Sequence, residues 1–353
     1  MLLNAEETLQ QLSQDTDASR EVLQSVSNAS ALVGVEWQDA GPAIADIIAV
    51  TQDRTGPHAT ENAVGALALM QAVGDLPKSG EDTITNDDVR EAITTMASNY
   101  IDTFGRTPID GDSYVTTTQG TSTISITGQD MRDFLEIVNS NQEESVALQT
   151  FVQSYTQAAV QNGLQNAPDS MQIIYEQTGT IAGNVLRGRQ DALGWEAADA
   201  QARAEIQAQL QAERYAANVG MLDMGVGALQ TGIGFVPGAG SLLSFGTGLV
   251  YQDLRPDAPT PDIPEIPEED LRELREQQER DIQMGTARAV LAVADGGHNI
   301  QGYVDPPPGV RDALDNGTYT QEVQYWLDQL RTNGVPVNYP ENAEAFNDKV
   351  EKN

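Results

Sequence analysis

The sequence contains no cysteine and only three lysines, Lys78, Lys349 and Lys352, in 353 residues. Without cysteine the chain can form no disulfide bond, cannot bind a metal through thiolates and has no cysteine nucleophile. Because no lysine lies between positions 78 and 349, the long central part of the chain cannot contain a Walker-type phosphate-binding loop. These absences exclude enzymes with a cysteine nucleophile or a thiolate-bound metal and, for the central part of the chain, enzymes with a Walker-type nucleotide site.

Positive charge is scarce in general, with 19 basic against 53 acidic residues and a formal net charge of −34. Such a surface repels nucleic-acid phosphates and anionic lipids, so we expect no nucleic-acid partner. The excess of acid favours solubility, including in concentrated salt, where ions screen the repulsion between carboxylates. Attraction of a cationic partner is the alternative use of this charge.

The first residues, Met1 to Glu7, lack the basic and apolar regions of a secretory signal peptide. We therefore expect export to the cell envelope or exterior by a route without a cleaved signal, or a fragment of a longer exported protein. A cytoplasmic location is the alternative.

Most of the chain shows helical periodicity. The stretch "ENAVGALALMQAV" (61–73) is apolar almost all round, which predicts a buried helix. The stretch 85–104 begins with Thr85 or Asn86 as the cap, and the acids of its first turn suit the positive end of the helix dipole. We therefore expect a mainly α-helical protein, built as a multi-helix bundle or array.

One segment departs from this pattern. Residues 113–127 alternate β-branched side chains on either side of Gln119-Gly120, which predicts a small β-hairpin. The preceding Asp110-Gly111-Asp112 resembles the start of a calcium-binding loop, but the rest of the twelve-residue EF-hand pattern is missing. We interpret these three residues as a turn.

A weak internal duplication relates residues 9–33 to residues 134–158. Repetition of a helix–turn–helix unit is typical of helical arrays. The matching positions are Leu9 with Phe134, Leu12 with Ile137, and Leu23-Gln24 with Leu148-Gln149.

Prolines divide the second half of the chain. Their spacing between Pro256 and Pro267 forbids a helix and predicts an extended linker over 255–267. The linker separates a helical body, 1–254, from a smaller C-terminal helical segment, 268–353, which can pack back on the body. Within this segment one helix is expected to end near Gly296-Gly297 and another to span 320–330.

The run "GALQTGIGFVPGAGSLLSFGTGLVY" (227–251) is glycine-rich and uncharged. It contains Gly-x-Gly pairs, but none continues to the Gly-x-Gly-x-x-Gly pattern of a dinucleotide-binding loop. Nucleotide binding is therefore not expected. A membrane hairpin and a pair of helices packed in the protein core are the remaining interpretations.

We favour a packed helical hairpin over 217–252. As a membrane hairpin, each arm of about thirteen or fourteen residues would span about 20 Å, short of the ~30 Å hydrocarbon core. Insertion after acidification stays open as the alternative, because low pH neutralises carboxylates. The expected turn is Val236, Pro237, Gly238, Ala239 and Gly240, and the glycines expected to permit close helix contact are Gly232, Gly234, Gly246 and Gly248.

The chain has two histidines, His58 and His298. Neither belongs to a His-Glu-x-x-His pattern, and no Gly-x-Ser-x-Gly nucleophile motif is present. We interpret His298, which follows Gly297, as part of the cap of the preceding helix. The sequence thus favours a protein without enzymatic activity, cofactor, metal or nucleotide, with an enzyme of unrecognised type as the alternative.

Four segments follow one another along the chain in this order: "DVREAITTMASNYIDTF", "GQDMRDFLEIVNSNQEESVALQTFVQSYTQAAV", "GTIAGNVLRGRQDAL" and "IGFVPGAGSLLSFGTGLVYQDL". This order resembles the helical region of large exported proteins of actinobacteria. These proteins are often called tetratricopeptide-region proteins, and some of them begin with WXG-type helical hairpins. Residues 236–240 are also similar to the PGAG or PGVG hairpin that precedes toxin domains in polymorphic toxins. The likeness covers most of residues 1–254.

The chain also departs from these proteins. None of its tryptophans begins a Trp-x-Gly turn, and the Tyr-x-x-x-Asp/Glu export signal is missing. A thirty-four-residue tetratricopeptide period is not visible, and no recognisable toxin domain follows residue 254. A toxin activity is therefore not carried over.

The resemblance implies a non-enzymatic scaffold or delivery region of an exported, toxin-like or effector protein, which binds a protein partner. A pore-forming protein that contacts membranes conditionally through 217–252 is one alternative. A structural or adhesin-like component of a surface assembly is the other.

Overall fold

The computed structural model describes residues 2–35, 39–78, 83–194, 198, 202–203, 205–214, 216–217, 233–234, 244–245 and 271–337. The protein is mainly α-helical with a small β-hairpin, as the sequence predicts. Its contacts form two compact units. The first comprises Met1–Leu148 and Val185–Glu196, and the second comprises Gln149–Asn184 and Ala197–Asn353. The boundary expected at residue 254 therefore lies inside the second unit.

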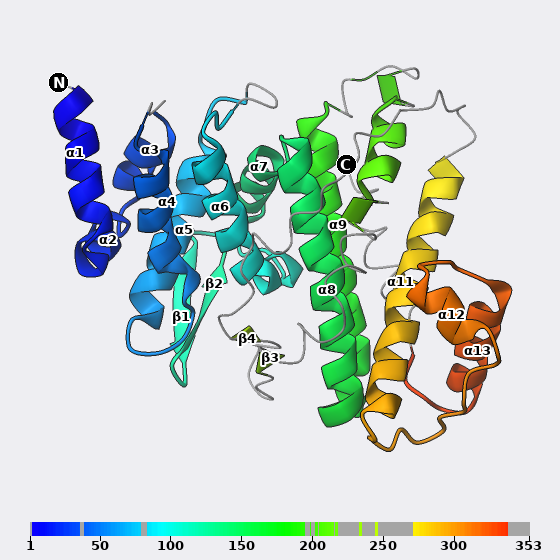
Figure 1. Ribbon diagram of the computed structural model, residues 1–353. Coiled ribbons are helices and arrows are strands. Elements are labelled where there is room, and N and C mark those ends of the chain that lie inside the picture. The colour runs from blue at the N-terminus through cyan, green and yellow to red at the C-terminus, as the bar shows by residue number, and fades with distance from the viewer. Residues whose placement is uncertain are drawn as a thin grey trace. The chain divides into compact units, whose positions relative to one another are not determined.

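The first unit contains short helices, the β-hairpin and parts of two long helices (Figure 1). Its elements are α1 (Leu2–Ser13), α2 (Thr16–Val22), α3 (Val26–Val33), α4 (Gly41–Ala49), η1 (Val50–Gln52), α5 (Ala59–Gly74), α6 (Asp87–Asn99), η2 (Ile101–Gly105), β1 (Tyr114–Thr118), β2 (Thr121–Ser125), α7 (Gly128–Val138), the start of α8 (Gln142–Asn166) and the end of α9 (Met171–Ala192).

Helix α5 forms the core of this unit. It contacts α3, α7 and both strands of the hairpin, and Leu69, Met70 and Val73 are fully buried. A helix covered on several sides can bury apolar residues around its whole circumference, which explains the apolar run in the sequence. The prediction of a buried helix at 61–73 is confirmed.

Helix α6 packs on α4 and begins as predicted. The side chain of Asn86 accepts a hydrogen bond from the backbone N–H of Val89, 3.2 Å away, and so satisfies a free donor of the first turn. Asp87 and Asp88 follow in that turn and are exposed. Their charge lies at the positive end of the helix dipole and suits the start of a helix without any metal.

The β-hairpin at 113–127 is also confirmed. Strands β1 and β2 pair antiparallel, with Thr118 opposite Thr121 and Tyr114 opposite Ser125. Between them Gln119 and Gly120 both adopt positive φ values, 52° and 77°. Two consecutive residues with positive φ are typical of a type I′ turn, whose twist matches the twist of the two paired strands.

The duplicated segments fold differently from one another. In the first copy Asp15 caps α2 and Ser25 caps α3, so that the chain is divided into three short helices. In the second copy α7 is followed by α8, which runs without a break from Gln142 to Asn166. At the same offset of 125 residues, Asp15 matches Ser140, which lies in the break between α7 and α8, whereas Ser25 matches Thr150 inside α8. The first break is therefore shared by the two copies and the second is not.

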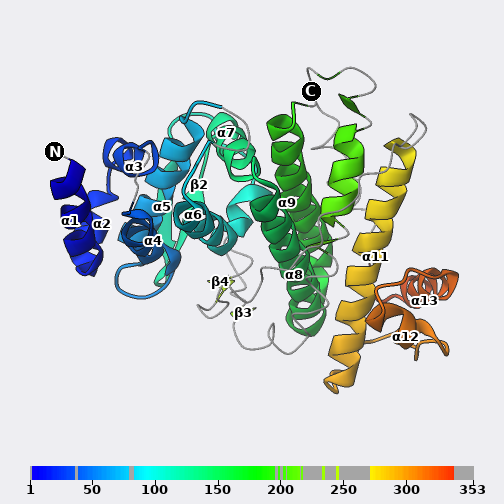
Figure 2. The same ribbon diagram turned by 45° about the horizontal axis from the view of Figure 1, so that its top comes forward.

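In the second unit, the remaining parts of α8 and α9 lie side by side, joined through η3 (Pro168–Ser170) (Figures 1 and 2). Gly163 of α8 allows Met171 and Ile174 of α9 to approach closely. The C-terminal part of the unit consists of α11 (Leu271–Asp295), α12 (Val310–Asp315) and α13 (Gln321–Thr332), which contact one another.

An ion pair ties α11 to the helical residues 205–214. Arg214 Nη2 lies 2.9 Å from Asp281 Oδ2, and both side chains are largely buried. The C-terminal segment therefore contacts residues 205–214, which the sequence analysis assigned to the helical body.

Two glycines of the second unit provide a stability test. Gly302 and Gly309 both have positive φ, 86° and 93°, but only at Gly302 would an added Cβ overlap a backbone atom, the carbonyl oxygen of Asn333. We expect Gly302→Ala to lower the free energy of unfolding by about 3 kcal/mol, from backbone strain and overpacking, and Gly309→Ala by about 1 kcal/mol from strain alone. Urea unfolding followed by far-UV circular dichroism measures both, and equal losses would contradict this packing.

Candidate functional site

The glycine-rich run was the first predicted site, and the structure describes little of it. Ile233–Gly234 (β3) and Ser244–Phe245 (β4) form a short antiparallel pair, with Ile233 opposite Phe245. The predicted helix is therefore wrong at these four residues, including Gly234. Glycine disfavours helix by about 1 kcal/mol relative to alanine, and isoleucine and phenylalanine favour strands. The turn residues 236–240 and the glycines at 232, 246 and 248 lie outside the described residues.

His298 lies where α11 ends, as predicted. Gly297 has a φ of 77°, and the backbone N–H of His298 donates to the carbonyl oxygen of Val293 at 3.2 Å. This arrangement satisfies the last carbonyl groups of a helix, and a glycine in the left-handed region permits it. The prediction that His298 belongs to the cap of the preceding helix is confirmed.

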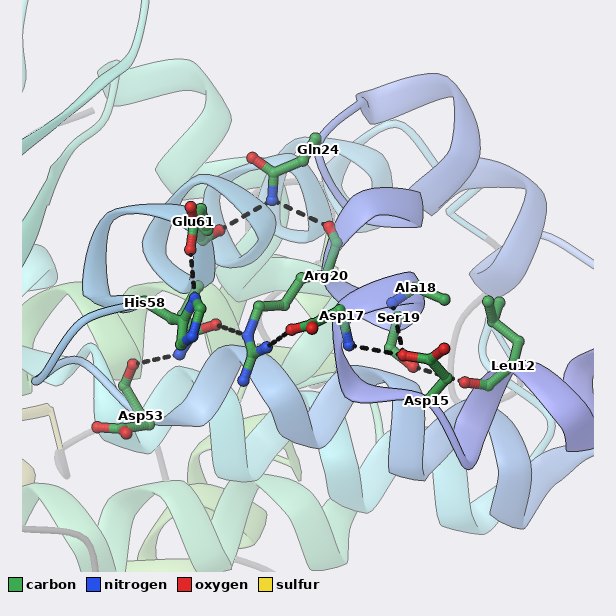
Figure 3. A network of polar contacts seen from close by, with 11 residues as sticks. Leu12, Asp15, Asp17, Ala18, Ser19, Arg20, Gln24, Asp53, His58 and Glu61 are labelled. Carbon is green, nitrogen blue, oxygen red and sulfur yellow. Dashed lines mark hydrogen bonds and ion pairs between the residues drawn. The ribbon is translucent and has the colours of Figure 1, made fainter.

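His58 belongs to a polar network in the first unit (Figure 3). Its Nδ1 atom lies 2.7 Å from Oε2 of Glu61, one turn further along the start of α5. Both side chains are about half exposed, so water screens this pair. None of the contacts drawn in Figure 3 joins His58 to a hydroxyl group that it could activate as a nucleophile.

The buried part of the same network is Asn62. Its amide oxygen accepts a hydrogen bond from Nε of Arg20 at 3.0 Å, and its amide nitrogen donates to the carbonyl oxygen of Asp53 at 2.8 Å. Gln24 adds bonds to the carbonyl oxygens of Arg20 and Glu61. The network therefore holds α2 and the residues after it against the first turns of α5.

This difference in burial leads to a testable prediction. Asn62→Ala is expected to lower the free energy of unfolding by about 1–3 kcal/mol, because it leaves the partners of a buried amide unsatisfied. His58→Ala, four residues earlier, is expected to change it by less than about 1 kcal/mol, because its contact with Glu61 is about half exposed to water. Thermal or urea unfolding of the two variants measures both changes. A larger loss of unfolding free energy for the histidine variant than for the asparagine variant would refute this division of roles.

A second cluster, centred on a buried ion pair, was not predicted from the sequence. Arg54 and Asp102 are only 3% and 7% exposed and form a two-pronged ion pair. Nη1 of Arg54 lies 2.6 Å from Oδ1 of Asp102, and Nη2 lies 3.2 Å from Oδ2. Nη2 of Arg106 reaches the same carboxylate at 2.9 Å. A buried charge is tolerated where its partners satisfy it this completely.

The electrostatics of this cluster follow from burial and from the two arginines. Burial by itself would raise the pKa of Asp102, but the charges and hydrogen bonds of Arg54 and Arg106 outweigh it and hold the pKa below its ordinary value. The Arg54 guanidinium also lies 4.8 Å from the ring centre of Tyr100. Burial raises the pKa of Tyr100, whose hydroxyl donates to the carbonyl oxygen of Thr51 at 3.0 Å.

The lowered pKa of Asp102 predicts a pH dependence. The stabilisation by its carboxylate is fully present above the unfolded-state pKa of about 4 and is lost as pH falls through the lower folded-state pKa. In Asp102→Asn this contribution is absent at every pH. The gap in unfolding free energy between wild type and variant is therefore expected to be constant above about pH 5 and to shrink below about pH 4. Urea unfolding at a series of pH values measures it, and a gap that stays constant down to pH 2 would contradict the assignment.

The same arginine anchors the β-hairpin. Nε and Nη2 of Arg54 donate to the carbonyl oxygen of Ser122 at 3.4 and 3.2 Å, and the Arg54 carbonyl accepts from the Ser122 N–H at 3.0 Å. Nη1 donates to the carbonyl oxygen of Asn99 at 2.8 Å. Strand β2 is thus fixed to the end of α6 through a single buried side chain.

A cavity of about 220 Å³ lies between the end of α3 and the start of α6. Its wall combines apolar side chains with the polar side chains of Thr83, Thr85 and Asn86, and the side chain of Asn86 already caps α6. Ligand pockets are usually larger, about 300–1,000 Å³, and carry several convergent polar groups. With a volume of about 220 Å³, this cavity is smaller than most substrate sites. The apolar lining residues are Leu32, Val33, Val35, Leu76, Ile84 and Val89.

Among the residues that the structure describes, no three His, Asp or Glu side chains are grouped to hold a metal ion. In the same residues no helix has both the length and the apolar character needed to cross a bilayer. Comparisons with protein-family models, with curated proteins and with solved structures found no match. The fold and the sites therefore define a mainly α-helical protein with an anchored β-hairpin, and function must be argued from its own residues.

Proposed function

We propose that this chain is a non-enzymatic helical scaffold or delivery region of an exported, toxin-like or effector protein, and that it acts by binding a protein partner. The proposal is supported mainly by the role of two buried arginines. Arg54 and Arg189 both donate hydrogen bonds to main-chain carbonyl oxygens of neighbouring elements. Such bonds fix the elements relative to one another.

Arg189 illustrates this use. Its side chain is fully buried, and its Nη1 donates to the carbonyl oxygens of Asn139 and Ser140, both at 2.7 Å. These carbonyls follow the end of α7, where a cation also compensates the helix dipole. A catalytic arginine would instead direct its donors towards a reacting group. The geometry of Arg189 supports a structural role.

The charge of the chain supports a cationic protein partner. With a net charge of −34, the surface attracts basic groups over long distances and speeds their association. Two observations support the export part of the proposal. One is the sequence resemblance, and the other is the absence of cysteine, which suits an oxidising exterior.

Expression of the tagged full chain in its native host, followed by separation of cytoplasm, envelope and medium, tests the export part of this proposal. Recovery from the envelope or the medium supports it. Confinement to the cytoplasm, with a known secreted protein recovered outside as the control, would refute export of this chain by itself.

The pore-forming alternative is favoured by one observation, the absence of charge from Met224 to Gln252. Release of a trapped dye from vesicles of phosphatidylcholine and phosphatidylglycerol, measured at neutral and at low pH, distinguishes the two functions. The scaffold proposal expects no release at either pH. Release at low pH alone would favour conditional insertion of 217–252 and count against a purely scaffolding role.

A further inference from the structure

The β-hairpin has one covered edge and one open edge. Because two residues form its turn, Thr118 and Thr121 are a hydrogen-bonded pair, and the next pair, Thr117 and Ser122, is not. The backbone groups of a pair of this second kind point away from the partner strand. Those of Thr117 and, two residues earlier, Val115 therefore point outwards from the edge of β1.

The outer edge of β2 is occupied. Ser122 exchanges hydrogen bonds with Arg54, and Thr121 forms an isolated bridge with Thr55. Further along, the carbonyl oxygen of Ile126 accepts from the N–H of Ile109 at 3.3 Å. On the outer edge of β1, by contrast, the backbone groups of Val115 and Thr117 make no hydrogen bond within the described part of the chain.

The open edge also lacks the usual protection against pairing with another chain. Natural edge strands are commonly interrupted by charged residues, prolines or bulges. Strand β1, Tyr-Val-Thr-Thr-Thr, contains neither charge nor proline, and its register with β2 is continuous from Tyr114 to Thr118. Tyr114 is 49% exposed and offers an aromatic contact beside the strand.

The charge around this edge indicates the partner. Asp110 and Asp112, just before β1, are exposed and form no ion pair within the described residues. The whole chain is strongly acidic, so that a second copy would be repelled while a basic segment would be attracted. The open backbone groups can pair with an extended strand, and the nearby carboxylates attract cationic side chains.

We propose that the outer edge of β1 is a docking site for an extended, basic segment of a partner protein, which adds a third strand to the hairpin. Main-chain hydrogen bonds to Val115 and Thr117 hold the added strand, and its cationic side chains lie near Asp110 and Asp112. This inference rests on the partner-binding part of the proposed function and names the surface and the chemical class of the partner.

The test uses the full chain and a peptide of about eight residues that alternates valine and threonine and has a lysine at each end. Thr117→Pro removes the outward N–H, and a proline is tolerated on the open side of an edge strand. Thr117→Val, the matched control, loses the hydroxyl that contacts Thr60 and Ser122 but keeps the N–H. We expect Thr117→Pro to weaken binding of the peptide by more than about tenfold and Thr117→Val by much less.

Two further measurements keep the test independent of whether the proline variant folds. In the wild type, addition of the peptide is expected to slow amide exchange at Val115 and Thr117. The double variant Asp110→Asn with Asp112→Asn is expected to bind several-fold more weakly and with a smaller dependence on salt. Equal binding by wild type and the folded proline variant, or unchanged exchange at Val115 and Thr117 with peptide bound, would overturn the proposal.

Self-association of the chain is a further possible outcome, and it would count against the basic partner. A dimer seen by sedimentation in the wild type and lost in Thr117→Pro would show that the edge receives a second copy, and the basic partner would be rejected. Failure of the docking test leaves the export experiment unaffected, because that experiment measures location and not binding.

Discussion

Replacement of Arg54 by methionine is expected to lower the free energy of unfolding of the first unit by about 3–5 kcal/mol. The substitution leaves the buried carboxylate of Asp102 paired with Arg106 alone among these arginines and removes donors from the carbonyl oxygens of Ser122 and Asn99. A buried group that loses its partner costs more than the net value of the bond itself. Urea unfolding followed by far-UV circular dichroism measures the loss.

Lys78→Met is the control for this substitution. Lys78 lies 2.8 Å from Asp133 and 2.5 Å from Glu136 but is 44% exposed, so its removal is expected to change stability by less than about 1 kcal/mol. If the two variants lost similar amounts of stability, the Arg54 cluster could not be the anchor of the hairpin.

Replacement of Arg189 by methionine is the second large effect that we expect, a loss of about 2–4 kcal/mol. Methionine fills much of the same space but donates no hydrogen bond, so the carbonyl oxygens of Asn139 and Ser140 lose a buried donor after the end of α7. The same unfolding measurement applies.

Arg132→Met offers a control on the same pair of helices. Arg132 of α7 reaches Asp191 of α9 at 2.9 Å, but its side chain is 47% exposed, and Asp191 keeps a second ion pair with Arg187. We expect a loss below about 1 kcal/mol. A loss as large as that of Arg189→Met would mean that burial does not decide the contribution of these arginines.

The elements with local signals could be predicted from the sequence. Asn86 followed by two acids marked the start of α6, and the β-branched residues around Gln119-Gly120 marked the hairpin. In both cases a side chain or a backbone conformation acts within a few residues of its position, and the pattern therefore appears in a short stretch of sequence.

The buried arginines could not be predicted in this way. Arg54 bonds to Asp102 and Ser122, which lie 48 and 68 residues away, and Arg189 bonds to Asn139 at a separation of 50. Nothing in the residues around Arg54 or Arg189 distinguishes them from surface arginines. Their partners come together only through the packing of elements that are distant in the sequence.

The contacts between helices of the second unit are a further feature that composition does not show. The prolines at 255–267 indicated a boundary, but the pairing of Arg214 with Asp281 joins residues on either side of it. A composition change marks a segment that is unlike its neighbours, and it does not show which helices bury their faces together.

The central claim is that buried Arg54 fixes β2 while the edge of β1 stays open, and amide exchange of the folded, unliganded protein tests it most directly. The N–H of Ser122 donates to the Arg54 carbonyl, and those of Thr116 and Thr118 face β2, so all three are expected to exchange slowly. The N–H of Thr117 is expected to exchange much faster. Protection of Thr117 equal to that of Thr116 and Thr118 would show that the edge is covered and would contradict the account.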